Sequence, residues 1–529
     1  MPSWLLITAA GLSVGAWLAW RSASTSPVDR IVLLALPPLL LFVALATLER
    51  IVAAPFWDWT AVRLASSFAL VQGHGMYPSP TDGPTLSYIY GPIFAVAFLP
   101  ATVSNQPTVA ITIAMVLQLA YFFVPALLLV RVFTGPGSDV SRNRVLAACV
   151  FALLALDSRA LFYSGFALHA DGPALGLLST ACLLLLRSKE PSTRRLVAVG
   201  LLASLAVWCK QPAMPIFIAL PLWLWVVEGR RTAARALLVF GAMGTLVSAI
   251  MLAGFGFSNM YFNMFTLPSM VPWKPSPDGR WALFRSQLRE LAKTAAPYLG
   301  MAIAGLLLGP PDRLPGRAQM GGWLKQRRWP LLLLIGILTV PTSVLGIVKR
   351  GGAVNSLSFT IFFVTLAGTL ALLDTANRGS GWRSATAKLL LLAAGIGVTV
   401  HHVAAVDPEM FTRGRDHLRR FWQNPQQQAN EMLAEHPGKI YFPWNPLAHL
   451  MVEDRLYHVE YGVNERRLAG IPMPRRQFRA QIPPDMRYLA FDQGRQSEWT
   501  RRDYLPEYSI RTELPGYPDW IIYRRAEES

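Results

Sequence analysis

Two aspartates stand where polar loops meet apolar segments. Asp58 opens "DWTAVRLASSFALVQG", directly after an apolar stretch, and Asp171 lies beside His169 in "FALHADGPALG". A carboxylate at the edge of a membrane can take a proton from a hydroxyl or hold a cation, and it is rarely placed there without a function. The structural alternative for both aspartates is to cap the start of a helix, or else to pair with Arg63 in the case of Asp58 and to shape an interfacial turn in the case of Asp171.

Three cations occupy similar places further along the chain. Lys210 in "VWCKQPAMPIF" has apolar residues on both sides, and an unpaired cation there is costly. A bound phosphate would pair with it, whereas snorkelling to lipid headgroups is the alternative. Lys349 and Arg350 precede two glycines in "VKRGGAVNS", whose backbone would let an anion approach closely. The alternative is that these two residues bind nothing and are simply an exception to the statistical rule that places Lys and Arg mainly in cytoplasmic loops.

The composition sets these residues in a membrane. Of the 529 residues, 53% are hydrophobic and 15% are charged, and the mean hydropathy is +0.35. Soluble domains carry about 25% charged residues, so the chain is predicted to be a polytopic membrane protein. We assign the net charge of +18 to cytoplasmic loops rather than to nucleic-acid binding. The three cysteines have neither disulfide nor metal spacing.

About 12 segments are long and apolar enough to be candidate membrane-spanning helices. They are 4–20, 31–48, 107–130, 145–163, 172–187, 195–209, 212–227, 236–257, 295–309, 330–348, 357–373 and 389–405. The segment 92–104 is too short to cross, and we predict a juxtamembrane helix there. With this assignment, one alternating set of loops, each with more Lys and Arg than Asp and Glu, faces the cytoplasm, in agreement with the positive-inside rule. Asp58, Asp171, Lys210 and the tail after 405 are then extracytoplasmic.

The tail differs from the rest of the chain in its composition. It is polar, and "GKIYFPW", "RYLAFD" and "DWIIYRR" are typical of short strands. "NPQQQANEMLAEH" and "PLAHLMVED" are typical of helices. The sequence therefore predicts two domains. Residues 1–405 form a membrane domain that includes the outer loop 49–106, and residues 406–529 form a small extracytoplasmic α/β domain.

The opening stretch resembles the GT-C superfamily of polytopic membrane glycosyltransferases. Asp58 is followed by apolar residues at helical spacing, then by Gly73 and Tyr77, and then by "YIYGPIFAVAFLP", in which Gly91 replaces the first proline of the family's pattern. The later order of Asp171, Lys210 and a closing outer domain is similar to that of lipid A aminoarabinose transferases and protein O-mannosyltransferases. The resemblance covers most of the membrane region, through loose motifs.

The resemblance implies an inverting glycosyltransferase in a bacterial inner membrane. Its donor would be a polyprenyl-phosphate monosaccharide, and its acceptor a lipid, a glycan or a protein of the cell envelope. Asp58 is then the expected catalytic base, with Asp171 as a second catalytic carboxylate. The other expected substrate contacts are Lys210, Tyr77, Tyr88, Tyr90, His169, Lys349 and Arg350.

Two questions stay open at this point. One acidic residue in each outer loop falls short of a paired metal site, so Mg²⁺ or Mn²⁺ held by Asp58 and Asp171 is an alternative to metal-free catalysis. A glycolipid transporter or flippase, or a non-catalytic glycan-binding protein, would also suit this composition. A transporter is expected to carry ionisable residues near the middle of the membrane. Here they gather at the predicted outer face, which favours an enzyme.

Overall fold

The computed structural model describes residues 3–21, 26–86, 88–132, 138–187, 190–309, 319–403, 419–492 and 499–526. The chain divides into two compact units. The first unit comprises Met1–Arg50, Gln118–Ser248 and Lys274–Gly414, and the second comprises Ile51–Leu117, Ala249–Trp273 and Arg415–Ser529. Three helices have residues in both units, namely α2 (Pro27–Ala53), α5 (Pro107–Val132) and α11 (Arg230–Phe255).

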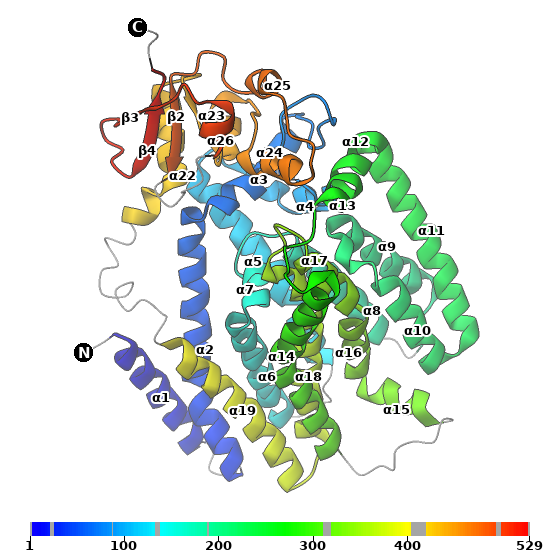
Figure 1. Cartoon of the computed structure of the whole chain (residues 1–529). Helices are drawn as coiled ribbons and strands as arrows, with labels where there is room; N and C mark the ends of the chain where they lie inside the picture. The colour runs from blue at the N-terminus through cyan, green and yellow to red at the C-terminus, as the bar shows by residue number, and fades with distance from the viewer. Residues whose placement is uncertain are drawn as a thin grey trace. The chain divides into compact units, whose positions relative to one another are not determined.

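The described part of the first unit is helical (Figure 1). Its other helices are α1 (Ser3–Arg21), α6 (Ser138–Asp157), α7 (Arg159–Gly165), α8 (Asp171–Leu186), α9 (Thr193–Cys209), η3 (Gln211–Ala213), α10 (Ile216–Glu228), α14 (Gly279–Leu308), α15 (Met320–Arg327), α16 (Trp329–Leu338), α17 (Val340–Ile347), η6 (Val354–Leu357), α18 (Ser358–Arg378) and α19 (Trp382–Val403).

All twelve predicted apolar segments lie mainly on helices, several of them with a short break, and the last residues of 389–405 lie outside the described residues. Within the described ranges, eight helices are long and apolar enough to cross a membrane, or nine if the bent pair α6–α7 is one span. The count is lower than predicted partly because α8 and α9 have only 16 and 17 residues. The chain is nevertheless a multi-pass membrane protein.

The candidate span predicted over 145–163 is not one straight helix. The helix stops at Asp157, and the chain continues as α7 at an angle of 103°. Ser158 adopts an extended conformation between the two helices, and its hydroxyl accepts a hydrogen bond from the Leu161 amide at 3.5 Å. Serine is a good residue for capping the start of a helix. A new helix therefore starts after Ser158, although the apolar pattern alone predicts that the first helix continues.

The core of the first unit is α18, which packs against α6, α14, α16 and α19. Nearly all of its apolar stretch is buried, as expected for a helix that is apolar on every face. Close packing with α14 depends on Gly305, where an added Cβ would lie 2.6 Å from the backbone of Ala371. Small residues at such contacts let membrane helices approach each other.

The second unit combines short helices with one sheet. Its helical elements are η1 (Ala54–Phe56), α3 (Asp58–Val71), α4 (Pro92–Ala97), η2 (Leu99–Val103), α12 (Phe257–Tyr261), the π-helical turn η4 (Phe262–Thr266), α13 (Leu267–Met270), α22 (Pro425–Glu435), α23 (Pro446–Glu453), α24 (Glu460–Leu468), α25 (Arg475–Arg479) and α26 (Trp499–Tyr504). The short helices α4 and η2 cover the segment 92–104, which was predicted to be too short to cross.

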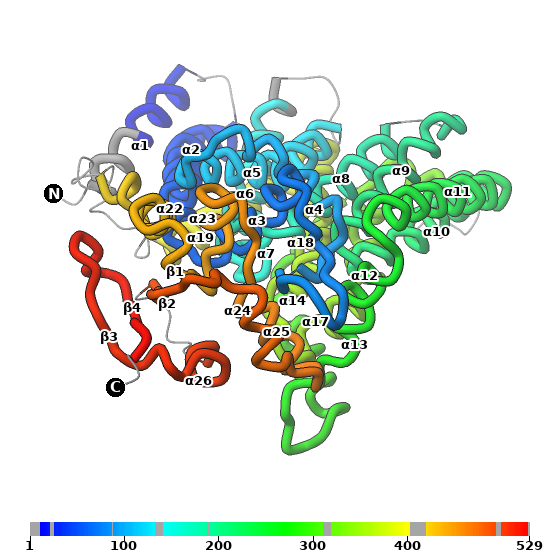
Figure 2. Tube along the Cα trace, turned by 90° about the horizontal axis from the view of Figure 1, so that it is seen from above, coloured from blue at the N-terminus to red at the C-terminus, as the bar shows by residue number. Residues whose placement is uncertain are grey.

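The sheet has the strand order β1-β2-β4-β3, and Figure 2 shows these strands in orange and red. The strands are β1 (Ile440–Tyr441), β2 (Tyr488–Asp492), β3 (Ile510–Thr512) and β4 (Trp520–Arg524). β1 pairs with β2 in parallel, and the two other pairings are antiparallel. Apolar side chains of α22 pack on the sheet, including Met432 and Leu433. The predicted small α/β tail is confirmed, with β3 as an additional strand.

The outer loop and the tail fold together in the second unit. Helix α3 packs on α23, and Gln72 donates from Nε2 to the carbonyl of Leu450 at 2.8 Å. Further along the loop, the Val459 amide donates to the Thr85 carbonyl at 2.9 Å. The sequence assigned this loop to the membrane domain, whereas its residues from Ile51 onward belong to the compact unit of the tail. The predicted boundary at 405 lies outside the described residues.

Candidate active site

The residues singled out from the sequence divide between the two units. Asp58 and the loop tyrosines lie in the second unit. The first unit holds His169, Asp171, Lys210, Lys349 and Arg350.

Asp171 is the centre of a buried polar cluster in the first unit. Its side chain is fully buried, and its Oδ1 accepts a short hydrogen bond from the ammonium of Lys210, which is also buried. The Nδ1 atom of His169 lies 2.6 Å from Oδ2. Asn355 contacts the same Oδ2 from its Nδ2 at 3.3 Å and the Nε2 of His169 at 3.0 Å. Sequence reasoning paired Lys210 with a phosphate, whereas here it pairs with a carboxylate.

The hydrogen bonds assign a role to each atom of this cluster. The 2.6 Å contact between the Nδ1 of His169 and Oδ2 favours a proton on Nδ1 over the longer approach of the Asp171 amide to the same nitrogen, at 3.3 Å, and we assign the Nε2 as the acceptor from the Asn355 amide. Both Asp171 oxygens then receive donors, and the carboxylate is stabilised as an anion. Such a carboxylate is poorly suited to take up another proton. It is well suited to fix the position of the Lys210 ammonium.

Local sequence explains how this cluster is built. Asp171 is the first residue of α8, and Gly172 follows it. A Cβ at Gly172 would collide with the side-chain amide of Gln118, and one at Gly176 would collide with the carbonyl of Tyr121. The two glycines therefore let α8 pack against α5. Lys210 follows the last residue of α9 in an extended conformation, which turns its side chain out of the helix path.

The loop after α17 brings further cations to the first unit. Lys349 is half-buried and Arg350 is exposed, and Gly351 follows with a φ of +78°. Lys274 donates from Nζ to the Gly352 carbonyl at 2.9 Å. Burial lowers the pKa of both Lys274 and Lys349 below the ordinary lysine value. The same loop continues to Asn355, so one segment carries both a cluster member and these basic side chains.

In the second unit, Asp58 lines a small, partly open cleft. It is the first residue of α3 and is half-buried. A second carboxylate, Asp492, lines the cleft from the carboxyl end of β2. The other polar walls are Gln426 and Asn445, and the aromatic walls are Phe442, Trp444, Phe491 and Trp520. Carboxylates, amides and aromatic faces together are the groups that bind a sugar through its hydroxyls and its apolar face.

Aromatic packing ties the cleft to helix α3. Trp59, next to Asp58, makes edge contacts with Trp444 at 5.6 Å and with Tyr461 at 4.6 Å between ring centroids. The guanidinium of Arg63 lies over the ring of Trp59 at 5.3 Å. These contacts fix the first turn of α3 against the tail, and with it the backbone of Asp58.

The three predicted tyrosines pack within the outer loop. Tyr77 and Tyr88 are buried, and their ring centroids lie 5.6 Å apart. The Tyr77 hydroxyl donates to the Tyr90 carbonyl at 2.7 Å, and the Tyr88 hydroxyl donates to the Gly91 carbonyl at 2.9 Å. These hydrogen bonds shape the loop. A role of the tyrosines in sugar binding stays a prediction.

A divalent metal would meet competition at Asp171, because Lys210, His169 and Asn355 already donate to its two oxygens. Dependence on Mg²⁺ or Mn²⁺ therefore stays a prediction, and we assign no step to a metal. Sequence reasoning did not single out Asn355 or Asp492. The position of Asp492 at the end of the predicted strand "RYLAFD" is a signal that could have found it, whereas no local pattern marks Asn355.

Comparisons with known proteins complete the description of the site. No protein-family model matches the chain, and no curated protein matches it. Among solved structures, ArnT from Cupriavidus metallidurans in the apo state is similar, with a TM-score of 0.40 and 12% identity over 92% of this chain and 97% of that one. ArnT from the same organism bound to undecaprenyl phosphate has a TM-score of 0.38 and 11% identity over 92% and 98% of the two chains. These low scores place no residue of the site.

Proposed function

We propose that this protein is a membrane glycosyltransferase that moves a sugar from a polyprenyl-phosphate monosaccharide to a hydroxyl of a cell-envelope acceptor on the extracytoplasmic face. The observation that carries the proposal is the cleft of the second unit, in which Asp58 lies among aromatic and amide side chains. The multi-pass membrane region supports it, because a polyprenyl-phosphate donor resides in the bilayer.

The proposed reaction is a single displacement. The acceptor oxygen attacks the anomeric carbon, the bond from that carbon to the phosphate oxygen breaks, and the polyprenyl phosphate leaves with the bonding electrons. Asp58 accepts the proton of the acceptor hydroxyl. One displacement inverts the anomeric configuration, unlike the two displacements of a retaining mechanism. Trp444 and Trp520 would hold the apolar face of a sugar ring near this carboxylate.

The basic side chains of the first unit are proposed to bind the phosphate of a polyprenyl lipid, a contact that lies within that unit alone. Lys349 and Arg350 follow a membrane helix, and a phosphate is a strong partner for such cations. Lys210 belongs to the same proposal, with Asp171 as the residue that positions its ammonium. Asp171 is then a positioning residue rather than a base, because its oxygens already accept from three donors.

A transporter is less well supported. In the described part of the first unit, the buried ion pairs lie within about two turns of helix ends and not in the middle of long helices. They are Asp29–Lys388, Arg327–Asp374 and Lys210–Asp171. The first two are explained by the attachment of neighbouring helices to each other.

The test is an assay of transfer by the purified, full-length protein in lipid nanodiscs. Radiolabelled undecaprenyl-phosphate hexoses, pentoses and aminosugars are supplied with an extract of envelope acceptors. We expect label to move from one of these donors to an acceptor, and NMR of the product to show an inverted anomeric carbon. Absence of transfer from every donor, together with glycolipid flipping in protein-containing liposomes, would overturn the proposal.

A further inference from the structure

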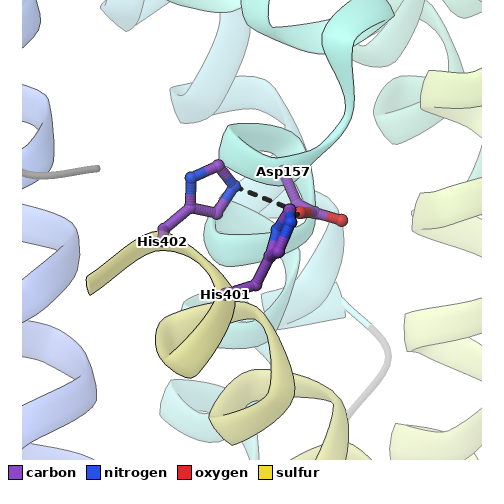
Figure 3. A group of neighbouring side chains, drawn as sticks. All are labelled: Asp157, His401 and His402. Atoms are coloured by element: carbon purple, nitrogen blue, oxygen red, sulfur yellow. Dashed lines mark hydrogen bonds and ion pairs between the residues drawn. The ribbon is translucent and has the colours of Figure 1, made fainter. Parts of the chain in front are cut away.

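We propose that the ends of α6 and α19 form a binding site for a divalent transition-metal ion such as Zn²⁺. Its protein ligands are Asp157, His401 and His402, which Figure 3 shows turned toward one another. The Oδ1 atom of Asp157 lies 3.0 Å from the Nδ1 of His401 and 3.1 Å from the Nε2 of His402. This cluster contains none of the residues to which the proposed transfer reaction assigns a role.

The two histidines converge although they are consecutive. Successive residues of a helix point about 100° apart, so the two side chains leave α19 in different directions. They reach the same carboxylate oxygen with different ring nitrogens, Nδ1 for His401 and Nε2 for His402. Their ring centroids are 5.1 Å apart. Each ring thus presents a nitrogen to one point, which is the arrangement that a shared ion requires.

The electrostatics of this place favour a cation. Asp157 is the last residue of α6, and the histidines lie in the last turn of α19. The two helices pack against each other. The C-terminus of a helix carries a partial negative charge, and a carboxylate there adds to it. Two helix C-termini and a carboxylate therefore create a negative potential that a divalent ion would neutralise.

The spacing and the donor set indicate the class of ion. Around Zn²⁺ at about 2.0–2.1 Å, tetrahedral ligand atoms lie about 3.3 Å apart. The two nitrogen–oxygen distances, 3.0 and 3.1 Å, are only slightly shorter. Two imidazoles and one carboxylate suit Zn²⁺, Co²⁺, Ni²⁺ or Cu²⁺, whereas Mg²⁺ and Ca²⁺ prefer oxygen ligands alone. A water molecule would take the fourth position.

Protein atoms do not enclose the cluster. The side chain of His401 is 75% exposed, and those of Asp157 and His402 are 33% and 26% exposed. An ion can therefore enter without opening the helix bundle. Bound there, it would link the end of α19 to the end of α6, next to the sharp turn at Ser158. The site is thus expected to stabilise the bundle rather than to take part in group transfer.

The experiment uses the full-length protein in detergent, after removal of any affinity tag and of metal with EDTA. Co²⁺ is titrated in while its visible absorption is followed, and Zn²⁺ is then added to displace it. We expect one Co²⁺ per chain, with an absorption typical of four-coordinate Co²⁺. We also expect Zn²⁺ to raise the thermal unfolding temperature of the metal-free protein.

Three variants and one control make the assignment specific. Asp157→Asn, His401→Ala and His402→Ala should each weaken Co²⁺ binding by at least about tenfold. His436→Ala, which removes a partly buried histidine of the second unit, should bind as the unaltered protein does. The proposal is overturned if the unaltered protein binds no Co²⁺, or if the three variants bind it with unchanged affinity. In that case the cluster is a hydrogen-bonded contact between two helix ends.

Discussion

Asp58 and Asp171 both begin a helix, yet their surroundings suit them to different chemistry. Asp58 is half-buried and lines a small, partly open cleft. Asp171 is fully buried, and its oxygens accept from a lysine, a histidine and an asparagine. Of the two carboxylates, Asp58 is therefore the one that we propose as the general base, and Asp171 is proposed to act through the residues it holds.

The first prediction concerns the base. Asp58→Asn keeps the size of the side chain but removes its basicity, so kcat should fall by about 10²–10⁴-fold. Expression, thermal stability and donor affinity should stay near those of the unaltered protein. Asp82→Asn is the matched control, because Asp82 is an exposed carboxylate of the same loop. If Asp58→Asn keeps more than about a tenth of the turnover, the base is another residue, and Asp492 is the next to test.

The second prediction concerns the buried ion pair. Lys210→Met leaves Asp171 charged and without its cation, which should cost about 3–5 kcal/mol of folding stability. Asp171→Asn should cost a similar amount, since it leaves the ammonium of Lys210 buried without its anion. The double variant should recover much of this loss, because neither charge is then left alone.

Thermal unfolding in detergent measures stability, and equilibrium binding of undecaprenyl phosphate is measured on the same samples. The donor-phosphate proposal expects weaker lipid binding in the double variant even where its stability recovers. Unchanged lipid affinity in a stable double variant would mean that Lys210 serves only the ion pair.

At the scale of elements, the packing of α14 on α18 determines how closely the central helix is enclosed. The third prediction compares two glycines of α14. Gly305→Ala should destabilise the protein by about 1–3 kcal/mol, because the new Cβ meets the backbone of Ala371, which cannot move aside easily. Gly300→Ala is the control, since a Cβ there meets nothing within 4 Å. Equal unfolding temperatures for the two variants would contradict this account.

The contact between loop and tail in the second unit contains a buried histidine. The Nδ1 of His458 accepts a hydrogen bond from the Thr85 amide at 2.9 Å, and the ring stacks on Phe478. Burial lowers the pKa of His458 to about 3. The unfolded chain therefore binds this proton more readily than the folded one, at pH values below the ordinary histidine pKa.

The fourth prediction follows from this difference in proton binding between the unfolded and the folded chain. The contribution of His458 to the free energy of unfolding is complete above about pH 6.5. It is lost as the pH falls toward about 3, by about 1.4 kcal/mol for each pH unit. Burial raises the pKa of Glu465 to about 8, which has the opposite effect on stability as the pH falls. His458→Gln separates the two groups, because its amide oxygen still accepts from Thr85 but does not titrate. Acid unfolding of this variant, followed by tryptophan fluorescence, should depend less on pH.

At the scale of the whole molecule, orientation in the membrane is predicted from loop charge alone. The fifth prediction uses single cysteines, since Cys149, Cys182 and Cys209 are all buried. Asp82→Cys and Gly516→Cys should react with an impermeant maleimide in intact cells or spheroplasts. Arg231→Cys should react only after permeabilisation. Labelling of Arg231→Cys in intact cells would reverse the topology and remove the proposed extracytoplasmic site.

Local sequence determined most of the elements. Apolar runs of sufficient length predicted the membrane helices, and short apolar runs predicted strands β1, β2 and β4, because both signals depend on neighbours along the chain. The helix that starts at Asp58 was predicted in the same way, from apolar residues at helical spacing. Ser158 is the exception, since a single capping residue ended a helix that the apolar pattern continued.

Only the tertiary structure decided which residues meet. Asn355 reaches Asp171 and His169 across more than 180 positions of sequence, and His402 meets Asp157 across 245. The outer loop joined the tail for the same reason, through contacts such as that of Gln72 with Leu450. The period of a helix or strand tells which face of an element is buried, but not which distant element covers that face. Each proposed site depends on such distant contacts, so its residue types were visible in the sequence and its geometry was not.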